Sequence, residues 1–201
     1  VAVVYGSASG LTASRLGWFW EEMLYGANSS ETFDNFGAAL AAGDFDGDGT
    51  TDLAVFRPTS GEWSLRLSQS GYSVPLFQKH QWGLSGDGPL VGDFDGDGRT
   101  DLAVYRPSSG YWFLLFSSTA YAVPNHSAFQ WGLPGDLPLA ADFDGDQKTD
   151  LTVYRPTTGE WFIRYSASGF SVAGYGRYQW GLPGDRPLVA RLRRRCLARP
   201  G

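Results

Sequence analysis

The stretch "GDFDGDGRTDLAVYRPSSGYW", residues 92–112, places an acidic loop before a strand-like segment that ends in Arg-Pro. Its acidic core, "DFDGD", begins at Asp44, Asp93 and Asp142, in steps of 49 residues. Three other features keep the same step, namely Arg57-Pro58, Arg106-Pro107 and Arg155-Pro156; Trp63, Trp112 and Trp161; and "QWG" from Gln81, Gln130 and Gln179. A fixed period near 50 residues predicts an array of stacked or radially arranged units.

Each unit has the pattern of four short strands. "PLVGDFD" leads into the acidic loop, "TDLAVYRP" leaves it, and "GYWFLLFSS" and "AFQWGL" follow. Continuous apolar runs such as "WFLLF" are typical of strands buried on both faces. Four strands in roughly 50 residues predict a blade of a β-propeller, whereas a right-handed β-solenoid, the alternative, usually has shorter repeats. We therefore expect an all-β fold, an incomplete β-propeller of about three full repeats plus a partial one.

The repeat divides the chain into five expected segments. These are a partial N-terminal blade at 1–43, repeats at 44–92, 93–141 and 142–190, and a basic tail at 191–201. The first segment has neither Gln-Trp-Gly nor Arg-Pro, and Trp18-Phe19-Trp20 alternates like a strand. A short helix beginning at Glu21 is the alternative there.

Composition and motifs exclude several classes of protein. The chain has 201 residues, a formal net charge of −5 and 27 glycines, which suits short strands joined by tight turns. No apolar run approaches the roughly 18 residues of a membrane span. Its single cysteine excludes an intrachain disulfide framework. Signatures of hydrolases, zinc proteases and nucleotide-binding enzymes are absent, so we expect a protein that is not an enzyme.

The acidic loops have the spacing of a calcium-binding loop. Carboxylates occupy loop positions 1, 3, 5 and 9, and the first two loops have glycine at position 6. In such a loop the carboxylates converge on the cation, the backbone carbonyl of position 7 adds an oxygen, and glycine permits the sharp turn. Val104, at position 12 of the second loop, replaces the glutamate of an EF-hand. The predicted metal ligands are Asp44, Asp46, Asp48, Thr50 and Asp52; Asp93, Asp95, Asp97, Arg99 and Asp101; and Asp142, Asp144, Asp146, Lys148 and Asp150.

A simpler interpretation is that aspartate and glycine only make turns. Four carboxylates within nine residues repel one another, however, and a bound cation would remove that repulsion. We therefore predict up to three Ca²⁺ sites, in preference to Mg²⁺, which keeps more of its water. The third loop has Gln147 at position 6, and if a positive φ is needed there, glutamine costs about 1 kcal/mol relative to glycine. We expect the third site to be the weaker one.

Repeated residues outside the loops have two interpretations each. Trp82, Trp131 and Trp180 could stack on sugars, but packing within or between blades is the favoured interpretation. The arginines of the Arg-Pro pairs could bind an anion, but an ion pair with an aspartate of a neighbouring blade is favoured.

The tail departs from the repeat at a defined point. A fourth acidic loop is due at residue 191, after Pro187-Leu188-Val189-Ala190, but the chain reads "RLRRR". One extra C before GAC-TTC-GAC-GGC-GA, which encodes the acidic loop, changes the reading to Arg-Leu-Arg-Arg-Arg. We expect the tail to be a frameshifted fourth loop; a true basic tail for nucleic acid or a membrane surface is the alternative.

The pattern D-x-D-G-D-G-x-x-D-L, together with Phe36-Gly37 and "AALAAG", resembles the FG-GAP repeat and the related bacterial VCBS repeat. The resemblance covers roughly residues 1–190. "FRP" and "YRP" stand where integrin repeats have a small Gly-Ala-Pro segment, so the bacterial type is the better match.

This resemblance implies a seven-bladed propeller with calcium in the loops between the first two strands of a blade. It also implies an extracellular or cell-surface location, a binding or adhesion role, and a protein or glycan ligand, without nucleic acid or membrane insertion. A lectin-like propeller and an accessory domain of a larger secreted enzyme are the alternatives.

Overall fold

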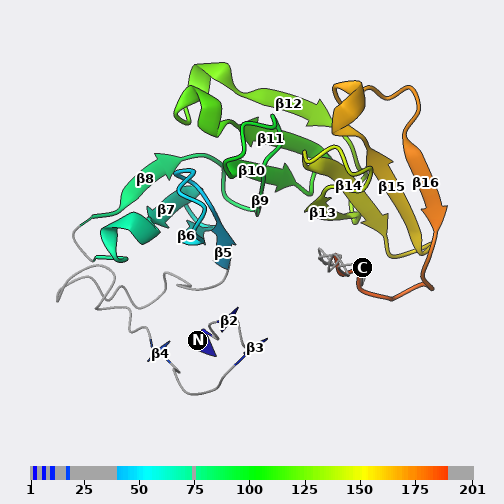
Figure 1. Cartoon of the computed structure of the whole chain (residues 1–201). Helices are drawn as coiled ribbons and strands as arrows, with labels where there is room; N and C mark the ends of the chain where they lie inside the picture. Colours follow the sequence, from blue (N-terminus) through cyan, green and yellow to red (C-terminus); the bar gives the residue numbers. More distant parts are fainter. Residues whose placement is uncertain are drawn as a thin grey trace, which may run out of the picture. The chain divides into compact units, whose positions relative to one another are not determined.

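The computed structural model describes residues 40–73 and 76–189, together with four two-residue strands near the N-terminus (Figure 1). By internal contacts the chain forms two compact units, Val1–Asp87 and Gly88–Gly201. The first unit contains a four-stranded antiparallel sheet, β5 (Leu40–Gly43), β6 (Asp52–Arg57), β7 (Glu62–Arg66) and β8 (Gln78–Gln81). The predicted all-β class is confirmed. Closure into a propeller stays a prediction.

The second unit contains two further sheets of the same design. One consists of β9 (Gly88–Gly92), β10 (Asp101–Arg106), β11 (Tyr111–Leu115) and β12 (Ser127–Gln130). The other consists of β13 (Leu137–Ala141), β14 (Asp150–Arg155), β15 (Glu160–Arg164) and β16 (Gly176–Gln179). In all three sheets each strand pairs with the next along the chain, and the acidic loop joins the first strand to the second. The sheets begin four or five residues before the acidic loops from which the repeats were counted.

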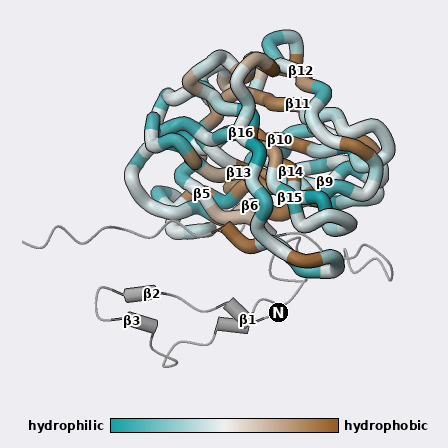
Figure 2. Tube along the Cα trace, turned by 90° about the vertical axis from the view of Figure 1, so that its right-hand side faces the viewer, coloured by the Kyte–Doolittle hydropathy of each residue, from teal (hydrophilic) through white to brown (hydrophobic). Residues whose placement is uncertain are grey.

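The register of the strands repeats as well. Tyr105 lies opposite Trp112, and the corresponding pairs are Phe56 with Trp63 and Tyr154 with Trp161. Hydrophobic and hydrophilic stretches alternate along the trace (Figure 2), and the second strands β10 and β14 are buried on both faces. This is the burial expected of strands in packed sheets.

Glycine is required in the turn between the second and third strands. At Gly110 the backbone φ is +70°, and a Cβ atom there would lie 2.2 Å from the carbonyl oxygen of Gly132. The close approach brings the QWG segment against the turn, where Trp112 Nε1 donates to the carbonyl of Trp131 at 2.9 Å. Gly61 and Gly159 have the same surroundings in the other two sheets.

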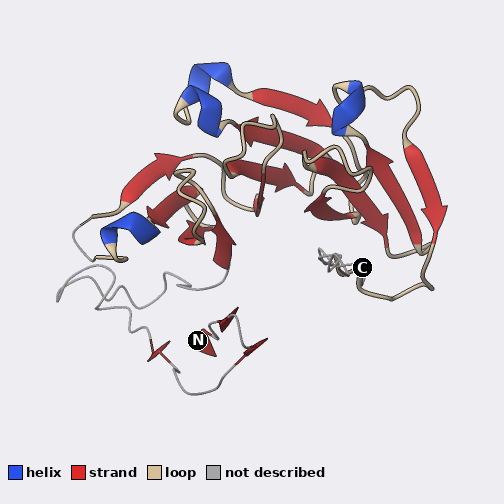
Figure 3. Cartoon of the chain, in the orientation of Figure 1, coloured by secondary structure: helices blue, strands red, loops and turns tan. Residues whose placement is uncertain are grey.

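A short 3-10 helix follows the third strand of every sheet (Figure 3). These are η1 (Ser68–Ser70), η2 (Ser117–Thr119) and η4 (Ser166–Ser168), and η3 (Val123–Asn125) is an additional turn in the second sheet's connection. None of the described residues forms an α-helix, and none of the described helices is long and apolar enough to cross a membrane.

The core of the second unit lies between its two sheets. Buried residues of the second sheet, among them Tyr105, Trp112 and Leu114, pack with Leu151 and Val153 of the third. The two sheets therefore share one apolar layer, as packed blades do.

Near the N-terminus, β1 (Ala2–Val3) pairs with β4 (Gly17–Trp18), and β2 (Gly6–Ser7) pairs with β3 (Gly10–Leu11). The alternative helix at Glu21 and the basic tail at 191–201 lie outside the described residues.

Candidate metal centres

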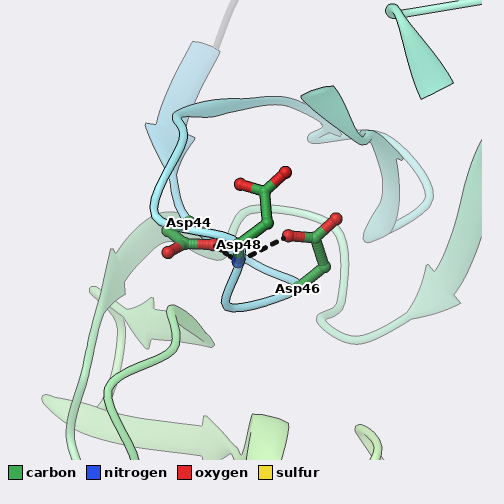
Figure 4. A group of neighbouring side chains, drawn as sticks. All are labelled: Asp44, Asp46 and Asp48. Atoms are coloured by element: carbon green, nitrogen blue, oxygen red, sulfur yellow. Dashed lines mark hydrogen bonds between the residues drawn. The ribbon is translucent and has the colours of Figure 1, made fainter. Parts of the chain in front are cut away.

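The first aspartate of each acidic loop organises the loop backbone. Asp44 Oδ1 accepts hydrogen bonds from the amides of Gly47 (2.7 Å) and Asp48 (3.1 Å), and its Oδ2 accepts from Gly49 (2.9 Å). Figure 4 shows the bond from the Asp48 amide. Because consecutive amides point at one carboxylate, the chain wraps around it. Asp93 and Asp142 accept from positions 4 and 6 of their loops in the same way.

Loop position 6 has a positive φ in all three loops. The values are 83° at Gly49, 85° at Gly98 and 74° at Gln147. The condition for the predicted glutamine penalty is therefore met, since a residue with a Cβ pays a steric cost in this region.

The structure brings three carboxylates together in each loop. One oxygen from each of Asp44, Asp46 and Asp48 lies within 4.8 Å of the other two. Figure 4 shows these side chains around the tight loop. The groups in the other two loops are Asp93, Asp95 and Asp101, from positions 1, 3 and 9, and Asp142, Asp144 and Asp146, from positions 1, 3 and 5. An all-oxygen, anionic donor set fits a hard cation such as Ca²⁺.

The aspartate at position 9 has a structural role that the spacing did not reveal. Asp52, Asp101 and Asp150 are buried with no exposed surface. Asp101 Oδ2 accepts from the amide of Phe94 (2.8 Å), and its Oδ1 accepts from the amide of Ser117 (2.7 Å) at the start of η2. The carboxylate thus ties the loop to the 3-10 helix. In the second loop alone it also belongs to the oxygen group that could hold a metal.

Burial raises the pKa of several of these carboxylates and so favours their neutral form. Desolvation raises the pKa of Asp101 to about 6, in spite of the hydrogen bonds from Ser117 and Phe94. Desolvation likewise raises the pKa of Asp93 and that of Asp150. A nearby cation favours the charged form of a carboxylate, so it would offset the cost of burying these charges.

Arg99, predicted as a carbonyl ligand, also uses its side chain. Its Nη2 lies 2.8 Å from Asp97 Oδ2, and it donates to the carbonyl of Ser117 at 3.0 Å. Burial raises the pKa of Asp97, but hydrogen bonds from the Arg99 amide, Ser117 and the guanidinium outweigh burial and lower it. Asp97 is thereby held by an internal cation and lies outside the group of Asp93, Asp95 and Asp101.

The other position-7 residues act through their backbone. The amides of Thr50 and Lys148 donate to the position-5 carboxylates at 2.7 and 2.8 Å. Metal coordination by the carbonyls of Thr50, Arg99 and Lys148 stays a prediction.

Sequence reasoning missed a serine and a tyrosine that close the loops. Ser68, Ser117 and Ser166 donate through Oγ to the position-5 aspartates at 2.8–3.2 Å. Tyr121 Oη donates to the carbonyl of Thr100 at 2.7 Å, and Tyr72 does the same to Thr51. The 49-residue period could have found the serines, because all three fall on it.

Where the second and third sheets meet, the repeated tryptophan packs between sheets as the sequence favoured, whereas the repeated arginine pairs with an aspartate in the turn that leads into its own sheet. Arg155 Nη2 lies 2.8 Å from Asp136 Oδ2, and Asp136 lies in the turn between β12 and β13, immediately before the first strand of the sheet that contains Arg155. Trp131 Nε1 donates to the carbonyl of Phe162 at 3.2 Å. Trp180, the equivalent residue of the third sheet, is 79% exposed.

Together, the four-stranded sheets and their acidic loops define an all-β repeat protein with candidate calcium loops. The FG-GAP repeat family model matches residues 36–74 and 85–123, each of which contains one acidic loop. The chain therefore contains FG-GAP repeats, as its sequence pattern indicated. No curated protein matches the chain.

Proposed function

We propose that this chain is a calcium-stabilised FG-GAP β-propeller module that acts outside the cell in binding or adhesion. The observation that carries the proposal is that three carboxylate oxygens gather in each of the three described loops, from positions 1, 3 and 5 in the first and third loops and from positions 1, 3 and 9 in the second. A repeat that places three carboxylates per blade in one small volume gains stability when a divalent cation is present, because the cation removes their mutual repulsion.

Calcium would supply positive charge at the centre of each loop. The groups proposed to hold it are the carboxylates of positions 1, 3 and 5 in the first and third loops, those of positions 1, 3 and 9 in the second loop, and the carbonyl of position 7. The backbone amides that bond to the position-1 aspartate keep that side chain oriented. Position 9 and the serine of the 3-10 helix connect the loop to the third strand. Ion binding would therefore stiffen the sheet, which is a structural role.

The extracellular location rests on the family, because FG-GAP repeats are typical of extracellular proteins. A non-catalytic role is supported by the near-identity of the loops, since an active site needs one distinct set of groups while a structural metal recurs with its repeat. The partner is proposed to be a protein or a glycan.

The glycan alternative depends on the exposed aromatic residues of the third sheet, among them Trp180 and Tyr178. Their equivalents Trp131 and Phe129 lie in or beside the core between the second and third sheets. Packing explains these aromatic positions better than sugar stacking, so we favour a protein partner.

The proposal is tested by calorimetric titration of the chain with CaCl₂ and, separately, with MgCl₂. We expect up to three calcium sites, and weaker binding of magnesium. Asp44→Asn, Asp93→Asn and Asp142→Asn should each remove one site, while Asp87→Asn, which alters a turn aspartate outside the loops, should leave all of them. Calcium binding that survives all three loop substitutions would contradict the proposal.

A further inference from the structure

The second acidic loop holds a guanidinium against one of its own carboxylates. Position 7 of this loop is Arg99, where the first loop has Thr50 and the third has Lys148. Arg99 donates from Nε (3.1 Å) and Nη2 (2.8 Å) to Oδ2 of Asp97, at position 5. Its Nη2 also donates to the carbonyl of Ser117 at 3.0 Å. The positive charge is therefore fixed between the loop and the 3-10 helix η2.

The aspartates at position 5 otherwise have the same partners in all three loops. Each accepts a hydrogen bond from the amide of position 7, at 2.7–2.8 Å. Each also accepts from the hydroxyl of the serine that begins the 3-10 helix, at 2.8–3.2 Å. The guanidinium of Arg99 is thus an additional partner that Asp97 has and its two equivalents lack.

Asp97 also differs from its equivalents in its place within the loop. Asp48 and Asp146 each bring an oxygen within 4.8 Å of the oxygens from positions 1 and 3, whereas in the second loop Asp101 takes the place of Asp97 in this group. The aspartate that pairs with an arginine is therefore the one that lies outside its oxygen group. The comparison is made within one chain, between loops of nearly the same sequence.

We propose that Arg99 is a tethered counterion of the second loop, which neutralises Asp97 as a bound cation would and thereby weakens calcium binding at this loop. Two effects act in the same direction. A carboxylate that is paired with a guanidinium attracts a cation less, and calcium affinity depends on the number of charged ligands. The guanidinium also repels a divalent ion in the same loop. This role of Arg99 rests on the proposed calcium function and names a residue that sets the affinity of one site.

The test is calorimetric titration of wild type and Arg99→Thr with CaCl₂, together with thermal unfolding of both in EDTA. Threonine stands at this position in the first loop, and the substitution keeps the backbone carbonyl. One calcium site should become about tenfold tighter in Arg99→Thr, because Asp97 is released to the cation. The melting temperature in EDTA should fall, because Asp97 then has no positive partner. If the variant is unfolded in EDTA, calcium should refold it, and the refolding midpoint gives the affinity.

Two further variants locate the effect. In the double variant Arg99→Thr/Asp93→Asn the tighter site should disappear, because Asp93 belongs to the second loop. Lys148→Thr is the matched control, since it removes the same charge from the same position of the third loop. The Lys148 side chain lies over Gly96, where a Cβ atom would be 2.5 Å from Lys148 Cε, but it forms no ion pair within the part of the chain that the structure describes. Its removal should therefore raise calcium affinity less than Arg99→Thr does.

Two results would overturn this role of Arg99. One is calcium affinity in Arg99→Thr equal to that of wild type, and the other is a gain that Lys148→Thr matches. Either result, with calcium sites still present in wild type, would leave the proposed function standing. A wild type and variants that all fail to bind calcium would instead remove the proposed function, and the role of Arg99 with it.

Discussion

At position 6 of the third acidic loop, Gln147 has a φ of 74°, close to that of the glycines in the other two loops. Its side chain pays a steric cost that glycine avoids. Gln147→Gly should therefore raise the free energy of unfolding by about 1 kcal/mol and strengthen calcium binding at the third loop. Urea denaturation and calcium titration measure the two effects. Gln147→Ala, which keeps a Cβ, is the control and should give neither gain; unchanged calcium affinity in the glycine variant would refute the weaker third site.

Thr152 is a second residue that departs from its repeat. The other two sheets have Ala54 and Ala103 at this position, and the buried Thr152 hydroxyl has no hydrogen-bond partner among the described residues. An unsatisfied buried hydroxyl costs about 1–3 kcal/mol, so the isosteric Thr152→Val should stabilise the chain by about 1 kcal/mol. Thr152→Ser keeps the hydroxyl and should be no more stable than wild type. Equal or lower stability of the valine variant in urea denaturation would show that the hydroxyl is satisfied in solution.

At the scale of the sheets, Arg155 of β14 pairs with Asp136 in the turn that leads into β13. Asp136 has a side chain only 2% exposed, so Arg155→Ala would leave a buried carboxylate without its cation. We expect a loss of about 2 kcal/mol in the free energy of unfolding. Arg177→Ala breaks the exposed pair with Glu160 and should cost less than about 1 kcal/mol. Similar costs for the two substitutions would show that the buried pair contributes no more to stability than the exposed pair.

Tyr105, in the core between these sheets, makes the stability of the fold decline at alkaline pH. Burial raises the pKa of Tyr105 to about 12. Because the ionised phenol is then favoured in the unfolded chain, this contribution to stability is complete below the ordinary tyrosine pKa near 10 and is lost as pH rises towards 12. Tyr105→Phe should flatten the decline of stability over this range, as followed by urea denaturation at each pH. Tyr111→Phe, at an exposed position, serves as the control, and parallel declines in wild type and Tyr105→Phe would contradict the assignment.

Much of each sheet is predictable from the sequence, because the 49-residue period aligns three versions of the same strands and loops. The loop spacing also identifies Asp44, Asp46 and Asp48 as neighbours, since tight turns bring alternate residues together. Spacing alone does not reveal that Asp101 is fixed by two backbone amides, or that Arg99 pairs with Asp97. Asp101 and Arg99 also bond to Ser117 of the 3-10 helix, which lies 16 to 18 residues further along the chain.

At the scale of the whole molecule, the stability of the sheets is linked to the charge of the acidic loops. Each loop contributes buried or crowded carboxylates that disfavour folding on their own, and a hydrogen bond joins each loop to the 3-10 helix of its sheet. A cation that binds only the folded chain would stabilise it by RT ln(1 + [L]/Kd), about 2.7 kcal/mol per site at roughly a hundred times Kd.

The most direct measurement is thermal unfolding of the chain in EDTA and in a calcium series, followed by circular dichroism. We predict a cooperative transition whose midpoint climbs with calcium, and a smaller climb when Asp44, Asp93 and Asp142 are all replaced by Asn. A cooperative transition at the same temperature in EDTA and in calcium would contradict calcium stabilisation, and the acidic loops would then be turns without a metal.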